Sequence, residues 1–117
     1  MSGTARHILI VDDEVDLLEA LRDAFSDEGY VVTTAVNGRD ALEKLPTMAR
    51  PCVVILDLLM PVMTGNELVA EMRADPRYSD IPLIVSTSDP SRSPPGVPVM
   101  RKPVKLNAMF QAVGRLF

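Results

Sequence analysis

The chain alternates between short apolar runs and longer segments in which apolar residues recur at helical spacing. The short runs are rich in Val and Ile, which is typical of strands that are covered on both faces. We expect strands at residues 8–11, 30–35, 53–56, 83–85 and 97–100. Apolar positions three and four residues apart predict amphipathic helices between and after these strands. We expect the helices from 15 to Gly29, around 41–45, from 65 to 74 and from 106 to 117.

The regular order of strand and helix predicts an α/β fold, a doubly wound parallel sheet of five strands with helices on both faces. Asn37-Gly38 marks a turn, and Thr64 stands three residues before Glu67, the spacing of a capping box. The stretch 86–96 departs from the order, because three prolines there exclude a regular helix of any length. The fourth helix is therefore expected to be reduced or absent.

Composition narrows the class of protein. With 117 residues, of which 47% are hydrophobic and 24% charged, the chain is expected to form one folded domain, 1–117. The net charge of −4 and the lack of a basic cluster argue against binding of nucleic acid. Asp57 interrupts the longest apolar stretch and no export signal follows residues 1–7, so we expect a cytoplasmic protein without membrane contact. The one cysteine, Cys52, cannot form an internal disulfide and is interpreted as a small buried side chain.

Acidic residues follow two of the predicted strands. Asp12 and Asp13 come after the first strand, and Asp57 comes after the third. Parallel strands bring their carboxyl ends to one edge of a sheet, where open α/β sheets bind ligands. Carboxylates gathered there repel one another unless a hard divalent cation neutralises them, so the pattern predicts a Mg²⁺ site. Taken alone, the run from Asp12 to Glu14 is better explained as the cap of a helix.

Five features in order resemble the receiver domain of bacterial two-component response regulators. They are the acidic pair, Asp57 with Met60-Pro61, Gly65, Thr87, and Lys102-Pro103. The resemblance spans essentially the whole chain and implies a flavodoxin-like, three-layer α/β/α fold.

By this resemblance, Asp57 takes a phosphoryl group from a sensor histidine kinase or a phosphotransfer protein. It also implies that Asp13 and Asp57 bind Mg²⁺ directly, Asp12 acts through water and the backbone carbonyl of Leu59 completes the protein ligands. A carboxylate suits this role, since phosphoryl transfer depends mainly on positioning and charge neutralisation.

The resemblance gives Lys102 and Thr87 contacts to phosphoryl oxygens. Each residue has a plainer explanation: Lys102 as a solvated surface residue and Thr87 as a turn former. New contacts from the two residues after phosphorylation would reposition their loops, which is the switch hypothesis. An unidentified downstream protein is implied as a partner, and a weak dimer is left open.

Several positions depart from the family pattern. The reduced fourth helix and Val99, where an aromatic residue is common, put the usual output surface and aromatic switch in doubt. Leu59 and Asp89 are hypothesised to tune the lifetime of the phosphoryl group, with a sign that the sequence does not give.

Two other function classes stay open from the sequence. One is a pseudo-receiver that binds partners without phosphorylation, and the other is a Mg²⁺-dependent phosphohydrolase of small molecules. The chain has no cap to enclose a small substrate, which argues against the phosphohydrolase. The start at Met1 slightly favours a stand-alone receiver, although a fragment would look the same.

Overall fold

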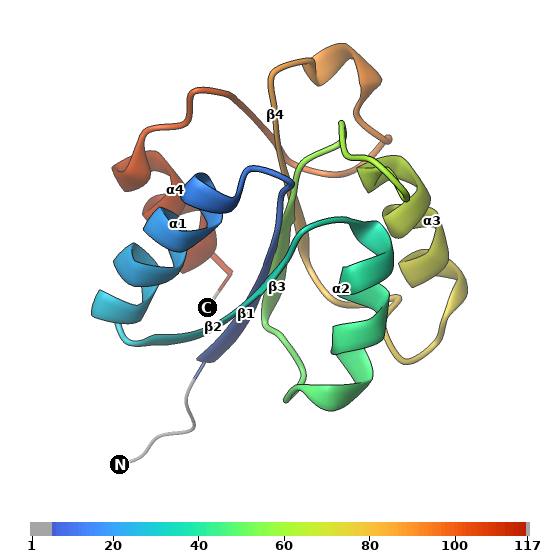
Figure 1. Ribbon diagram of the computed structural model, residues 1–117, viewed down its shortest axis with the longest axis horizontal. Helices are drawn as coiled ribbons and strands as arrows, with labels where there is room; N and C mark the ends of the chain where they lie inside the picture. Colours follow the sequence, from blue (N-terminus) through green and yellow to red (C-terminus); the bar gives the residue numbers. More distant parts are fainter. Residues whose placement is uncertain (1–5, 117) are drawn as a thin grey trace.

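The computed structural model describes residues 6–116, which form a five-stranded parallel sheet (Figure 1). The strand order is β2-β1-β3-β4-β5, so β1, β3 and β4 lie inside and β2 and β5 form the edges. This order confirms the predicted doubly wound parallel sheet. The strands are β1 (Arg6–Val11), β2 (Tyr30–Ala35), β3 (Val53–Leu56), β4 (Leu83–Thr87) and β5 (Val99–Arg101).

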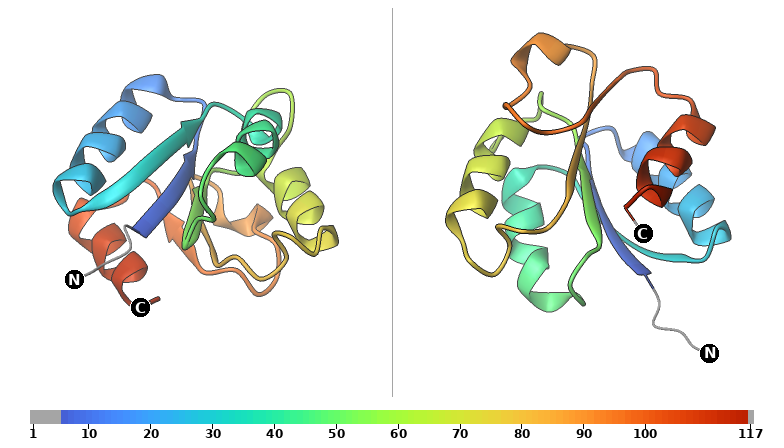
Figure 2. Two further views of the ribbon diagram at one scale, coloured as in Figure 1. Left: turned by 90° about the horizontal axis from the view of Figure 1, so that it is seen from below. Right: turned by 180° about the vertical axis from the view of Figure 1, so that it is seen from behind.

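Helices cover both faces of the sheet, which gives the expected three layers (Figures 1 and 2). On one face lie α1 and α4, and on the other lie α2 and α3. Two short 3-10 helices complete the described elements. The helices are α1 (Val15–Asp27), α2 (Gly38–Lys44), η1 (Leu45–Thr47), α3 (Gly65–Ala74), η2 (Pro90–Arg92) and α4 (Leu106–Gly114).

Side chains of the central strands point alternately into two apolar layers. In β3, Val54 and Leu56 pack toward α2 and α3, whereas Val53 and Ile55 pack toward α1 and α4. All four residues are fully buried, which explains why the strand reads as an unbroken apolar run. Burying each such side chain contributes about 1.5–3 kcal/mol to folding. The interior strands therefore form a rigid base for the residues that follow them.

The start of α3 is fixed by the predicted capping box. The hydroxyl of Thr64 accepts a hydrogen bond from the Glu67 amide at 3.2 Å, and the Glu67 carboxylate accepts one from the Thr64 amide at 3.1 Å. Gly65 then passes so close to the end of β3 that a Cβ there would lie 2.1 Å from the carbonyl oxygen of Asp57. Only glycine fits this approach, so α3 begins directly against Asp57.

Several sequence-based boundaries need correction. β5 begins at Val99 rather than at 97, since Pro98 has no amide to donate to the sheet. α4 ends at Gly114, and Leu106 and Leu116 are each 40% exposed rather than part of the buried face, which holds Met109 and Val113. The end of the predicted last helix, Phe117, and most of the segment searched for an export signal lie outside the described residues.

The segment between β4 and β5 contains only the three-residue η2, as its prolines predict. Side chains of α3 hold this segment instead. The amide of Asn66 donates a hydrogen bond to the carbonyl of Arg92 at 2.9 Å, and Arg73 donates to the carbonyl of Pro95 at 3.0 Å. The polar bonds thus attach the segment to the sheet through α3.

Two other expectations concern single features. Cys52 is a free thiol and is half-buried rather than fully buried, and this burial raises the pKa of its thiol. Among the described helices, none has the length and apolar character that crossing a membrane requires.

Candidate functional site

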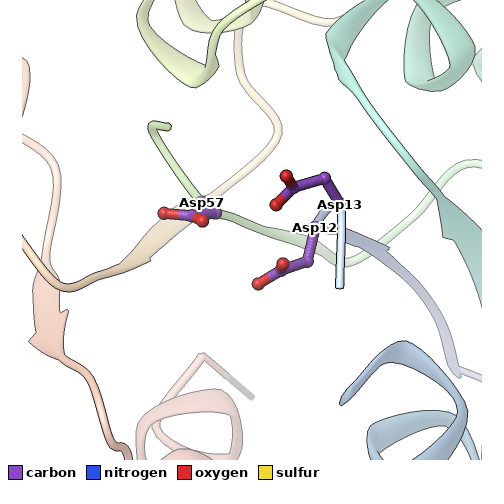
Figure 3. Close-up of side chains that lie close together, drawn as sticks. All are labelled: Asp12, Asp13 and Asp57. Carbon is purple, nitrogen blue, oxygen red and sulfur yellow. The ribbon is translucent and has the colours of Figure 1, made fainter. Parts of the chain in front are cut away.

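The three predicted acidic residues come together at the carboxyl edge of the sheet (Figure 3). In the register of β1 and β3, Val11 lies opposite Leu56, so the residues that follow each strand are neighbours. Asp12, Asp13 and Asp57 each place a carboxylate oxygen within 4.8 Å of the others. The predicted convergence of these acids is confirmed.

The three carboxylates differ in burial and in hydrogen bonding. Asp12 and Asp57 are buried, whereas Asp13 is exposed. The amide of Leu58 donates to Asp57 at 2.7 Å, which orients that carboxylate, and the amide of Glu14 donates to Asp12 at 2.9 Å. Glu14 is the N-cap of α1 and forms no side-chain cap. Helix capping therefore does not account for the acidic cluster.

Lys102 joins two of these acids and is not a solvated surface residue. Its ammonium nitrogen lies 2.5 Å from Oδ2 of Asp12, 3.3 Å from Oδ2 of Asp57 and 3.6 Å from Oε1 of Glu14. Its side chain is only 15% exposed. The Lys102 amide also donates to the carbonyl of Thr87 at 2.8 Å, which anchors the backbone that carries the lysine. One cation thus offsets part of the repulsion within the acidic cluster.

Burial and pairing act in opposite directions on the charges of the site. For Asp12, burial is the largest influence and raises the pKa of the carboxyl, although Lys102 and the Glu14 amide favour the ionised form. For Lys102, burial alone would lower the pKa, but the contacts with Asp12 and Asp57 together outweigh burial and raise it. The desolvated carboxylate can bind a further cation, and the charged lysine beside it can bind an anionic group.

Thr87 and Asp89 follow the end of β4 beside this site. Thr87 is fully buried, and its hydroxyl accepts a hydrogen bond from the Asp89 amide at 3.2 Å, which is the turn-forming role. Asp89 accepts from Ser91 at 2.5 Å and pairs with Arg92 at 3.1 Å. The predicted contact of Thr87 with a phosphoryl group, the Leu59 carbonyl ligand and the influence of Asp89 on hydrolysis stay predictions.

A cavity of about 480 Å³ opens from Asp57 and Lys102. It includes Ser86, which the sequence reading left inside the irregular stretch and did not assign to the site. Strand periodicity could have placed this residue, because positions two apart in a strand share a face and Ser86 therefore follows Ile84. Ser86 is thus a candidate site residue that the sequence did not predict.

The geometry of the cluster fits a hard divalent cation. Carboxylate oxygens are the ligands that Mg²⁺ prefers, and it keeps several positions for water and phosphate. The exposure of Asp13 leaves an open side for those ligands, while buried Asp12 and Asp57 fix the inner side. The same arrangement leaves Lys102 within reach of a group bound to Asp57.

Comparison with known proteins gives a consistent result. The profile described as the response regulator receiver domain matches residues 8–94. The response regulator SaeR of Staphylococcus aureus (strain USA300) is 38% identical over 82 residues, which cover 70% of this chain and 34% of SaeR. The chain thus spans about a third of the length of the curated relatives it matches.

Solved structures show the same fold. The chemotaxis response regulator CheY4 of Vibrio cholerae superposes with a TM-score of 0.84 at 32% identity, covering 97% of this chain and 100% of CheY4. The response regulator TrrA of Thermotoga maritima, solved in complex with Mg²⁺-BeF, gives a TM-score of 0.83 at 31% identity and covers 96% of this chain and 99% of TrrA.

Proposed function

The chain belongs to the response regulator receiver domain family of two-component signalling, and on that premise we propose that Asp57 is its phosphoacceptor. The observation that carries the proposal is the setting of this one carboxylate. It stands at the carboxyl end of the central strand β3 and accepts a hydrogen bond from the Leu58 amide at 2.7 Å. One of its oxygens lies 3.3 Å from the ammonium nitrogen of Lys102. Asp12 is held more closely by Lys102, and Asp13 is exposed, so Asp57 is the better placed nucleophile.

The proposed reaction moves one phosphoryl group. A carboxylate oxygen of Asp57 attacks the phosphorus of a phosphohistidine and the P–N bond breaks. Its electron pair stays on the ring nitrogen, and the imidazole leaves neutral because its other nitrogen carries a proton. The product is an acyl phosphate on Asp57. Water later attacks this phosphorus, which releases inorganic phosphate and restores the carboxylate. The chain thus promotes only its own phosphorylation and dephosphorylation, in keeping with a regulatory family.

Asp12, Asp13, Asp57 and the backbone carbonyl of Leu59 would hold Mg²⁺ in this proposal. When bound, Mg²⁺ neutralises charge on the transferred oxygens. Lys102 supplies a second positive charge, and its present pairing with Asp12 keeps it beside the reacting carboxylate. Thr87 would donate its hydroxyl hydrogen to a phosphoryl oxygen, because the hydroxyl oxygen only accepts from the Asp89 amide and its hydrogen is not used in that bond.

Phosphorylation adds roughly 1.5–2 negative charges at pH 7. Those charges would draw Lys102 from Asp12 and reorient the hydroxyl of Thr87. Thr87 ends β4 and Lys102 directly follows β5, so the two residues bracket the segment between the strands together with β5. Leu59, whose side chain is 45% exposed, and Asp89 would set how readily water reaches the phosphoryl group. No aromatic residue stands at Val99 to act as a switch, so movement of this segment is the proposed output.

The wider setting is also a proposal. Receiver domains exchange phosphoryl groups with histidine kinases or phosphotransfer proteins, and we assign this chain a partner of that kind in the cytoplasm. A single domain over 1–117, an unidentified downstream protein, no contact with nucleic acid or membrane, and a weak dimer complete the proposal. No observation favours the phosphorylation-independent alternative, since all three acids and Lys102 are assembled.

Intact mass spectrometry tests the proposal. The protein is incubated with acetyl phosphate and Mg²⁺, alongside Asp57→Asn and the matched control Asp13→Asn. We expect a single phosphoryl adduct in the wild type, none in Asp57→Asn, and a slowly formed adduct in Asp13→Asn. An adduct that persists in Asp57→Asn would reject Asp57 as the acceptor, and a wild type without any adduct would reject phosphoacceptance.

A further inference from the structure

The cavity beside the acidic site extends between α1 and α4, which lie side by side on one face of the sheet (Figures 1 and 2). Its volume of about 480 Å³ falls in the range of small-molecule sites. Leu17 and Leu21 of α1, Met109 of α4 and Val104 of the preceding loop form its apolar wall. The apolar part of a small ligand in this cavity would therefore be covered on two sides by helices.

Ser86 places a polar group in this apolar surrounding. The residue is 7% exposed and lines the cavity. Its hydroxyl forms no hydrogen bond with the residues that the structure describes, and its oxygen is not sealed off, so an occupant of the cavity can reach it. A hydroxyl in the wall of a mostly apolar cavity is available to form a hydrogen bond with a polar group of an occupant.

The polar end of the cavity carries a net negative charge. Lys102 is the cation there, and carboxylate oxygens of Asp12, Asp57 and Glu14 lie within 3.6 Å of its nitrogen. Three carboxylates around one ammonium leave two negative charges uncompensated. Asp57, Glu14 and Lys102 line the cavity, so its wall carries one net negative charge, and Asp12 behind Lys102 adds another. This charge favours a cationic group on an occupant.

We propose that this cavity binds a small amphipathic amine. Its apolar body lies between α1 and α4, and its ammonium group donates a hydrogen bond to Ser86 and faces Asp57 and Glu14. Binding of the amine does not depend on whether Asp57 can be phosphorylated. Its regulatory effect rests on the proposed function, because an ammonium beside Asp57 opposes binding of Mg²⁺ to the same carboxylate.

A matched ligand series tests the charge and the apolar contact. Hexylamine, hexanol and hexanoate are titrated into protein with ¹³C-labelled methyl groups, and the shifts of Leu17, Leu21, Val104 and Met109 are followed. We expect hexylamine to bind with a Kd of about 1 mM, which is ordinary for a ligand of this size. Hexanol should bind about five-fold more weakly, and hexanoate should not shift these signals. Equal binding of hexanol and hexylamine would overturn the assignment of an amine.

Variants test the location. Leu17→Trp fills the cavity and should weaken hexylamine binding at least about ten-fold, whereas Leu106→Trp adds the same ring to an exposed position outside the cavity and should leave binding unchanged. Ser86→Ala removes the hydroxyl without adding an atom and should weaken binding about three-fold. Amide spectra establish that each variant is folded, and unchanged binding in both Leu17→Trp and Ser86→Ala would overturn the site.

Competition with Mg²⁺ separates this inference from the proposed function. Hexylamine should raise the apparent Kd of Mg²⁺, measured from the amide shifts of Asp13 and Asp57, and Leu17→Trp should abolish that effect. If the apparent Kd of Mg²⁺ does not change when hexylamine is added, the placement of the ammonium group is overturned. If acetyl phosphate gives no adduct while the methyl shifts and competition persist, the proposed function fails and the amine site stands.

Discussion

The ammonium nitrogen of Lys102 lies 2.5 Å from Asp12, a residue 90 positions earlier in the chain. This ion pair joins the carboxyl end of β1 to the segment that follows β5, and it is largely shielded from water. Lys102 therefore stabilises the acidic cluster while it occupies one of the oxygens that a metal ion would use.

Lys102→Met should lower the stability of the folded protein and raise its affinity for Mg²⁺. Loss of a largely buried ion pair leaves Asp12 beside Asp57, so we expect the free energy of unfolding to fall by about 1–3 kcal/mol. Removal of the competing cation should lower the Kd of Mg²⁺ several-fold. Urea unfolding and Mg²⁺ titration measure the two effects. Lys105→Met, a control at an exposed lysine, should change neither quantity. A weaker affinity for Mg²⁺ in Lys102→Met would contradict competition between Lys102 and the metal ion for the same oxygens.

The charge state of Lys102 also predicts how stability depends on pH. Its pKa is raised in the folded protein above the ordinary value of 10.5, so the unfolded chain releases the proton first. Stability from this group is fully present below pH 10.5 and is lost as the pH rises through the folded pKa. Urea unfolding at several alkaline pH values should show a steeper loss in the wild type than in Lys102→Met, and parallel profiles would contradict the raised pKa.

Asp12 should show a dependence of the same sign, at acidic rather than alkaline pH. Burial raises the pKa of its carboxyl above 3.8, so the folded protein takes up this proton before the unfolded chain does as the pH falls. The destabilising effect of the buried charge is therefore relieved as the pH falls through the folded pKa. Carboxyl ¹³C shifts should give a pKa above 3.8 for Asp12. Asp12→Asn should lack the corresponding gain in stability, and a pKa at or below 3.8 would contradict the dominance of burial.

Gly65→Ala should be strongly destabilising. The added Cβ would lie 2.1 Å from the carbonyl oxygen of Asp57, and neither backbone can withdraw without moving α3 from the end of β3. We expect a loss of about 3 kcal/mol or more, measured by thermal and urea unfolding.

Gly114→Ala is the matched control, because apart from the chain neighbours and the backbone of α4 itself no atom lies within 4 Å of the added methyl group. Its free energy of unfolding should rise by about 0.5 kcal/mol. Equal effects of the two substitutions would show that close packing at Gly65 is not the cause.

Val62 is a valine with a φ of 69°, in the loop between β3 and α3. Its side chain is 75% exposed, so little packing offsets the strain of a β-branched residue in this conformation. Val62→Gly should raise the free energy of unfolding by about 1 kcal/mol, measured by urea unfolding. Val36→Gly, at an exposed valine without positive φ, should lower it by about 0.5 kcal/mol. Destabilisation by Val62→Gly would show that the strain is absent.

The parts of the structure that the sequence predicted are those governed by local rules. The run Val53 to Leu56 fixes a strand, Thr64 and Glu67 fix a helix start, and the strand ends fix where Asp12 and Asp57 meet. The pairing of Lys102 with Asp12 depends on distant segments, and no local pattern specifies it.

The other misses have the same origin. Leu106 and Leu116 carry the helical apolar spacing, yet burial depends on what else covers a helix, and they remain exposed. Ser86 was overlooked because prolines nearby drew the whole stretch into one irregular segment, although β4 continues to Thr87.

The hydrogen bonds from Asn66 and Arg73 to the segment between β4 and β5 end on main-chain carbonyls. Every amino acid supplies a carbonyl, so the side chains at 92 and 95 can be exchanged without breaking either attachment. The segment can thus diverge in sequence, and acquire new recognition chemistry, while its path over the domain is preserved. This makes it a natural place for an engineer to graft a binding peptide beside Asp57.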